Sequence, residues 1–123
     1  GKFKNAEGPV KGHNVEPVYF DVELNKDKDF NFKLPSTHNT FIYLVSGEIE
    51  VGKNKHANVK DSTLILLTRG EDLTVKAKSD AKFLLISGKP INEEIARGGP
   101  FVMNTKAEIL QAVQDYHNGT FVK

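Results

Sequence analysis

Histidine is the side chain with which this sequence could bind a metal or move a proton, and the chain of 123 residues has four of them. A first-row transition metal needs imidazole and carboxylate donors that converge on one point. The sequence contains no His-x-His pair and no cysteine. It therefore predicts no metal centre, no thiol nucleophile and no disulfide. The four histidines are His13, His38, His56 and His117.

His38 is the histidine best placed to touch a small molecule. It lies in the loop 35–39, directly before a dense run of β-branched and aromatic residues at 40–45. In a barrel, such a loop lies near the mouth, so we expect a ligand pocket formed by His38, Asn39 and Tyr43. Two simpler alternatives stay open. His38 could be a loop histidine hydrogen-bonded to Asn39 or water, and Tyr43 could be a core tyrosine with a satisfied hydroxyl.

The remaining polar groups have simpler explanations, and we expect no catalytic residue. His13 lies in a segment without a pattern, His56 lies beside a turn, and His117 ends a predicted helix, where a cation interacts favourably with the helix dipole. No Gly-rich phosphate loop is present. Adjacent acidic residues such as Glu71 and Asp72 would point to opposite faces of a strand, so they are poor candidates for a catalytic pair.

Short strands are the elements that must position His38 and Tyr43. Alternation of apolar and polar residues, or compact apolar runs, predict strands at 18–24, 30–34, 40–45, 48–51, 56–60, 64–67, 73–77 and 83–86. The run 64–67 is wholly apolar, which predicts a central strand. Strands of this number and spacing, separated by turn residues, are typical of an antiparallel sandwich or barrel.

The end of the chain follows a helical pattern instead. Thr105 and Glu108 form a capping box, apolar residues recur at helical spacing over 106–117, and Asn118-Gly119 supplies a stop. We therefore divide the chain into a linker or strap at 1–16, a β-barrel at 17–90, and a C-terminal strap and helix at 91–123.

The charge balance excludes two classes of partner. The formal net charge is +1, from 17 basic and 16 acidic residues, so we expect no contact with nucleic acid or an anionic membrane surface. No apolar stretch approaches the ~20 residues of a membrane span, and the N-terminal residues lack a signal-peptide core. The absence of cysteine suits a reducing compartment, and we expect a cytoplasmic location.

A run near the end of the sequence resembles the C-terminus of the pirin family. It reads Gly99-Pro100-Phe101-Val102-Met103-Asn104-Thr105, and is followed by Glu108-Ile109, Gln111-Ala112, Asp115-Tyr116 and Gly119-Thr120-Phe121. The segments 8–10, 39–47 and 84–90 also fit the second half of such proteins. Pirins are two-domain cupins, so the resemblance implies an all-β fold: a cupin, jelly-roll antiparallel β-barrel with a short C-terminal helix.

The resemblance also implies where metal ligands would lie. In the metal-binding domain of pirins, a His-x-His pair and a Glu precede a strand that ends in Tyr-x-x-x-Gly, which the segment from Tyr43 to Gly47 matches. Counting back from this match assigns three ligand positions to Lys33, Pro35 and Asn39, and the residue nearest the fourth position, after the turn at Gly70, is Leu73. None of these is a histidine or a glutamate. We therefore expect no cofactor, and no activity from this chain alone.

Three functions follow as expectations. The first is a metal-free C-terminal cupin domain that acts as a structural and dimerisation partner of a metal-binding N-terminal cupin outside this chain. The second is a small-molecule-binding module, and the third is a quercetin-type dioxygenase, an activity that the family includes. We also expect a homodimer, because Phe101, Val102, Met103 and Phe3 would form an uncovered apolar patch. The alternative is that the C-terminal helix covers this patch.

Overall fold

The structure, a computed structural model, describes residues 1–10, 14–52 and 57–122. His13 and His56 therefore lie outside the described residues. The chain divides into two compact units, Gly1–Pro90 and Ile91–Lys123.

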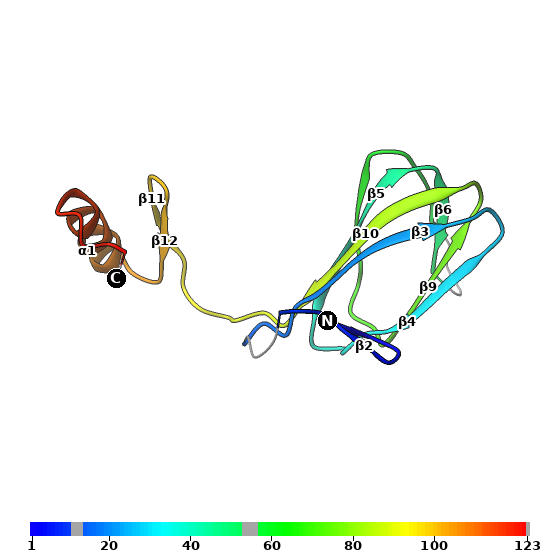
Figure 1. Ribbon diagram of the computed structural model, residues 1–123, viewed down its shortest axis with the longest axis horizontal. Helices are drawn as coiled ribbons and strands as arrows, with labels where there is room; N and C mark the ends of the chain where they lie inside the picture. Colours follow the sequence, from blue (N-terminus) through cyan, green and yellow to red (C-terminus); the bar gives the residue numbers. More distant parts are fainter. Residues whose placement is uncertain (11–13, 53–56, 123) are drawn as a thin grey trace. The chain divides into compact units, whose positions relative to one another are not determined.

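The first unit consists of antiparallel strands (Figure 1). They are β1 (Lys2–Phe3), β2 (Ala6–Glu7), β3 (Val18–Leu24), β4 (Asp29–Lys33), β5 (Asn39–Ser46), β6 (Glu48–Val51), β7 (Ala57–Lys60), β8 (Thr63–Leu66), β9 (Asp72–Ala77) and β10 (Ala81–Gly88). One four-stranded sheet has the order β3-β10-β5-β8 and the other has the order β4-β9-β6-β7. The expected antiparallel jelly roll is confirmed, built from two facing sheets rather than one continuously hydrogen-bonded barrel.

The core lies between these two sheets. Successive residues of a strand point to opposite faces, so each strand contributes alternate side chains to the interior. The first sheet supplies Ile42, Leu44, Phe83 and Leu85, and the second supplies Ile49 and Val75. All six are fully buried. Burying side chains of this size contributes about 1.5–3 kcal/mol each, so this layer is the main source of stability of the unit.

The apolar run at 64–67 does not form a central strand, and that prediction was wrong. β8 lies at the edge of its sheet, next to β5 alone. Ile65 packs against the core, whereas Leu64 and Leu66 are 54% and 77% exposed. The run is apolar on both faces because the outer face of this sheet is itself apolar, so composition alone could not distinguish an edge position from a central one.

The N-terminal residues form a hairpin, β1–β2, whose Phe3 joins an aromatic cluster. The ring of Phe3 lies 5.6 Å from that of Phe20, 5.9 Å from that of Phe30 and 6.1 Å from that of Phe32. Aromatic pairs at such centroid separations stabilise a fold beyond their area burial. The start of the segment expected as a linker or strap therefore contributes side chains to the packing of the first unit.

The second unit is a hairpin packed against a helix. Its elements are β11 (Ala96–Gly98), β12 (Phe101–Met103) and α1 (Lys106–His117). Gly98 lies against the side chain of Ile109, where an added Cβ would clash. The ring of Phe101 contacts those of Tyr116 and Phe121, so the second unit itself covers part of the apolar patch expected at 101–103. Val102 remains 61% exposed.

The capping box at the start of α1 is confirmed. The Thr105 hydroxyl accepts a hydrogen bond from the backbone N–H of Glu108 at 3.2 Å, and the Glu108 carboxylate accepts one from the backbone N–H of Thr105 at 2.8 Å. Hydrogen bonds from the side chain and backbone of Thr105 lower the pKa of Glu108. Two amides that a helix leaves without partners are satisfied in this way.

The turn between β5 and β6 depends on a glycine. Gly47 has φ +91°, and a Cβ added to it would clash with the carbonyl oxygen of Asp80 and lie 2.8 Å from the Cα of Ala81. Its backbone N–H donates to the carboxylate of Asp61. The turn therefore packs backbone to backbone against the start of β10.

We predict that Gly47→Ala destabilises the first unit by about 3 kcal/mol, because left-handed strain adds to overpacking against a backbone that cannot move cheaply. Chemical denaturation followed by fluorescence or circular dichroism measures this change. Gly70→Ala is the matched control, since nothing lies within 4 Å of its added Cβ. An equal effect of the two substitutions would contradict the prediction.

We predict that Thr105→Ala destabilises α1 by about 1 kcal/mol. The pKa of Glu108 is lowered in the folded state, so the contribution of its carboxylate is complete at neutral pH and is lost as the pH falls through that lowered pKa. Hydrogen exchange of the amides at 106–109 measures both effects. Glu108→Gln keeps a capping partner without the titration, so its amide protection should not vary with pH in the acid range.

Candidate functional site

His38 is buried at one end of the first unit. It lies just before β5, its backbone N–H donates to the carbonyl of Pro35 at 3.0 Å, and the residue is 4% exposed. Histidines are usually less completely buried than aliphatic residues, and a buried imidazole needs hydrogen-bond partners for both nitrogens. The two nitrogens of His38 differ in this respect.

The Nδ1 atom is part of a short chain of hydroxyl groups. It lies 3.2 Å from the Oγ of Ser87, which in turn lies 2.9 Å from the Oγ1 of Thr40. Ser87 is 3% exposed and occupies an inward position of β10, after Ala81, Phe83 and Leu85. These contacts fix the orientation of the imidazole ring, because Ser87 and Thr40 stand on paired strands.

The Nε2 atom is buried and makes no hydrogen bond to any of the described residues. The nearest carboxylate oxygen is Oε2 of Glu16, at 3.7 Å, which is beyond hydrogen-bond distance. Glu16 has a positive φ of 45°, an uncommon conformation for a residue with a side chain. Its position is held by its neighbour, since the carbonyl of Val15 accepts a hydrogen bond from the Lys89 N–H at 2.8 Å.

Two hollows meet at His38. The smaller, of about 160 Å³, opens at the end of the sandwich and includes Leu34, Thr40, Leu73 and Thr74 in its lining. The larger, of about 690 Å³, is bounded by Glu16, Lys33 and Phe32 and reaches the N-terminal hairpin.

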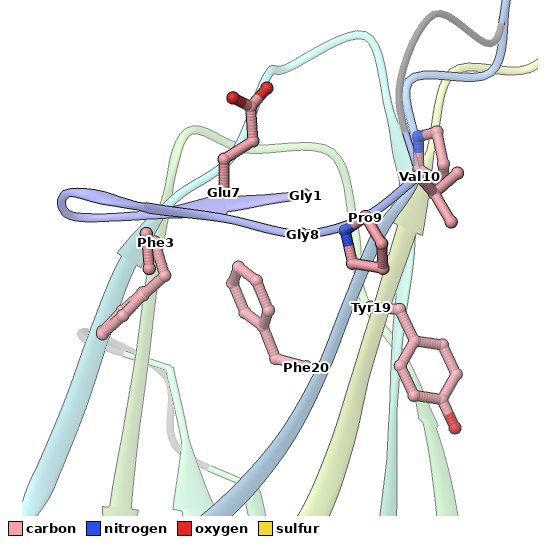
Figure 2. Close-up of a pocket in the computed structure, with 10 residues that line it drawn as sticks. Gly1, Phe3, Glu7, Gly8, Pro9, Val10, Tyr19 and Phe20 are labelled. Carbon is pink, nitrogen blue, oxygen red and sulfur yellow. The ribbon is translucent and has the colours of Figure 1, made fainter.

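A third hollow, of about 610 Å³, lies beside the β1–β2 hairpin and is mainly apolar (Figure 2). It shares Gly1, Glu7, Val10 and Pro17 with the larger hollow at His38. Figure 2 shows the side chains of Phe3 and Phe20 on one side of the hairpin, and that of Glu7 on the other. The two hollows therefore combine a polar end at His38 with an apolar end at the aromatic residues.

The structure does not bring the three expected pocket residues together. His38 lines two of the hollows, whereas Asn39 and Tyr43 line neither of them. Asn39 is exposed at the start of β5. Tyr43 points outward and is 39% exposed, because the inward positions of β5 belong to Ile42 and Leu44. His117 lies exposed in the last turn of α1.

Sequence reasoning did not single out Ser87 or Glu16. Ser87 has a recognisable signal, since it is a polar residue in the inward phase of a strand whose other inward residues are apolar. Glu16 has no such signal, because its approach to His38 depends on how the segment before β3 folds.

The residues at the implied metal-ligand positions do not fit a metal. Lys33, Pro35 and Asn39 are exposed, and Leu73 is buried in the core. Within residues 1–10, 14–52 and 57–122, no group of three or more His, Cys, Asp or Glu side chains could hold a metal ion. A transition-metal site needs several such donors around one point.

The outer face of the sheet β3-β10-β5-β8 is apolar over much of its area. Strand pairing aligns Tyr19, Ile86, Phe41 and Leu66 in one row across the sheet, and Leu84, Tyr43 and Leu64 in the next. Of these, Tyr19, Tyr43, Leu64 and Leu66 are exposed, as is Val45 on the same face. We call these eight residues the outer apolar face. Surfaces of this kind on soluble proteins usually mark interaction sites.

One corner of the sheet beyond this face is charged. Lys82 donates to the Glu23 carboxylate at 3.0 Å and lies 3.4 Å from that of Asp21. The hydrogen bond to Glu23, and to a smaller extent the one to Asp21, raises the pKa of Lys82. The charges therefore have partners within the chain.

Two facing four-stranded antiparallel sheets with a hollow at one end define a cupin of the jelly-roll type, and comparison with known proteins agrees. Residues 19–122 match the family described as the Pirin C-terminal cupin domain. The chain belongs to the pirin family.

Individual relatives agree with this assignment. A "Pirin-like protein" of Solanum lycopersicum is 40% identical over 83% of this chain and 36% of its own length. A "Putative quercetin 2,3-dioxygenase" of Vibrio cholerae is 37% identical over 93% of this chain and 39% of its own length. The crystal structure of a quercetin 2,3-dioxygenase from Acinetobacter baumannii superimposes with a TM-score of 0.83 and 33% identity, covering 98% of this chain and 41% of that one.

The chain spans about two fifths of the length of these relatives. In the described part of the chain, no helix has the length and apolar character needed to cross a membrane.

Proposed function

We propose that this domain is a metal-free structural partner of a metal-binding cupin domain, and that the outer apolar face is where the two meet. The observation that carries the proposal is the exposure of large apolar side chains on this face, with Leu66 at 77% and Tyr19 at 61%. Single exposed apolar residues are common, but a contiguous set across four strands is not.

The length of the relatives indicates the occupant of this face. The matched segment fills only 36–41% of each of the three relatives described above, so those proteins contain a further part large enough for a second domain. A partner within the same protein is present at high effective concentration, which favours docking through a mainly apolar surface. Among the described strands β8 is at the edge of its sheet, so its outer side offers backbone groups next to this face that a partner strand could use.

Catalysis would then belong to the partner domain. Two of the relatives are named as quercetin 2,3-dioxygenases, one of them putatively. The implied ligand positions of this chain carry Lys33, Pro35, Asn39 and Leu73, so we propose no dioxygenase step on its own residues. A cytoplasmic location and the absence of nucleic-acid contacts stay predictions.

A small-molecule-binding role is the second candidate. It is favoured by one observation: within the described residues, the buried Nε2 of His38 makes no hydrogen bond, and His38 lines a hollow of about 690 Å³. The two functions do not exclude each other, because the hollow of about 690 Å³ and the outer apolar face share no residue. The neighbouring hollow of about 610 Å³ shares only Tyr19 with that face.

We predict that the purified chain holds iron, nickel and zinc only substoichiometrically after mild chelation, because its ligand positions lack donors. Elemental analysis measures this. One tightly held metal per chain, lost in His38→Gln, would overturn the metal-free proposal. Variants of His13 and His56 extend the test to the histidines outside the described residues.

We predict that the isolated chain forms a homodimer at micromolar concentration, because the outer apolar face then has no other partner. The same face should bind the part of the Vibrio cholerae relative that lies outside the matched segment. Light scattering measures the first association and titration calorimetry the second. Leu66→Asp should weaken both at least tenfold, and circular dichroism checks its fold.

Leu110→Asp is the matched control, since Leu110 is 67% exposed in the second unit. It should leave both associations unchanged. Val102→Asp, at a residue that is 61% exposed, tests the alternative patch at 101–103 in the same way. A monomer that also fails to bind the Vibrio cholerae fragment, or associations that Leu66→Asp does not weaken, would contradict the proposal.

A further inference from the structure

The Nε2 atom of His38 is a buried polar atom in need of a partner. In the described part of the chain it is the buried side-chain nitrogen that makes no hydrogen bond, and its residue is 4% exposed. Buried polar atoms in folded proteins are almost always paired with protein, water or a ligand. His38 and Glu16, the nearest acidic group, both line the larger hollow, so the Nε2–Oε2 pair belongs to its wall.

The 3.7 Å gap between Nε2 and the Glu16 Oε2 suits a third atom placed to one side of the line that joins them. One oxygen can lie at a hydrogen-bond distance of about 2.8 Å from both. A hydroxyl oxygen fits this position, because it donates its proton to the carboxylate and accepts one from Nε2–H. The hydrogen bond between Ser87 Oγ and His38 Nδ1 is compatible with a proton on Nε2.

The charges around the hollow favour a neutral molecule. Lys2 pairs with Glu7 at 3.4 Å, and Lys33 and Glu16 add one charge of each sign. A carboxylate at His38 would lie beside the Glu16 carboxylate, 3.7 Å from Nε2, and an ammonium group would place a second donor against Nε2–H. A hydroxyl group avoids both costs.

The remaining walls favour an apolar body. Val10, Pro17 and Phe32 line the hollow at His38, and Phe3, Phe20 and Tyr19 line the adjoining hollow (Figure 2). Volumes of about 690 and 610 Å³ are in the range of small-molecule sites.

Building on the small-molecule-binding role proposed above, we propose that the larger hollow binds a neutral small molecule with a hydroxyl group and an apolar ring or chain, the hydroxyl bridging His38 Nε2 and the Glu16 carboxylate. Glu16 is the residue that selects the hydroxyl, and its left-handed backbone conformation, held by the Val15–Lys89 hydrogen bond, keeps its carboxylate near the imidazole. No chemical step is involved, only recognition.

Four matched naphthalenes test the proposal on the full chain: 2-naphthylmethanol, 2-methylnaphthalene, 2-naphthoate and 2-naphthylmethylammonium. Long-range ¹H–¹⁵N correlation of the imidazoles follows Nε2 of His38 directly, with His117 as an internal reference. We expect the alcohol to shift the His38 Nε2 resonance and to bind at least tenfold more tightly than the other three.

Variants distinguish recognition of the hydroxyl by His38 and Glu16 from binding of the apolar ring alone. Glu16→Asn keeps a residue that tolerates positive φ but shortens the side chain, so the alcohol should lose its advantage over 2-methylnaphthalene. Glu71→Asn, at an exposed glutamate outside the hollows, should change nothing. Equal binding of the alcohol and the methyl compound, an advantage that survives Glu16→Asn, or no binding by any of the four would overturn the proposal and leave water as the occupant.

Discussion

The pairing of β10 with β3 on one side and β5 on the other is the constraint from which the other features of the first unit follow. The pleat of β10 points Phe83 and Leu85 into the core and Leu84 and Ile86 to the opposite face. The same alternation carries Ser87 inward, where it meets the imidazole of His38. One strand therefore supplies the centre of the core, the middle of the outer apolar face and the hydroxyl that orients the buried histidine.

The second unit is stabilised less by its own interior than the first unit is. Residues 91–123 are fewer than the ~40 that usually suffice for an independent fold without disulfides, metals or a partner. Its interior rests on the contact of Ile109 with Gly98 and on the ring of Phe101 against Phe121, 5.1 Å apart. Leu110 and Tyr116 remain largely exposed. We therefore expect the second unit to be less stable than the first.

Sequence patterns specified most of the fold and little of the site. Alternation located β3, β4 and β9, compact apolar runs located β5 and β10, and the capping box at Thr105 located α1, because these signals are local. The edge position of β8 was missed, since an apolar run is equally compatible with a buried strand and with one whose outer face is apolar. His38 was recognised as a candidate, but its contact with Ser87 joins residues 49 positions apart, and no local pattern encodes it. Tyr43 was expected in the pocket, but it points outward, and periodicity does not tell which phase of an apolar strand faces the core.

The close approach of Gly47 to Ala81 has a consequence for how β5 and β10 find their alignment. In most sheets a slip by one residue is prevented because it exchanges an apolar face for a polar one. From Phe83 to Ile86 both faces of β10 are apolar, so that exchange would carry little penalty there. The backbone contact at Gly47 admits only one neighbour, and displacement would bring other atoms against a turn that has no room for them. A single glycine thus adds a backbone constraint to the alignment of two strands over the stretch where their side chains are apolar on both faces, while Lys82 and Ser87 constrain the ends of β10.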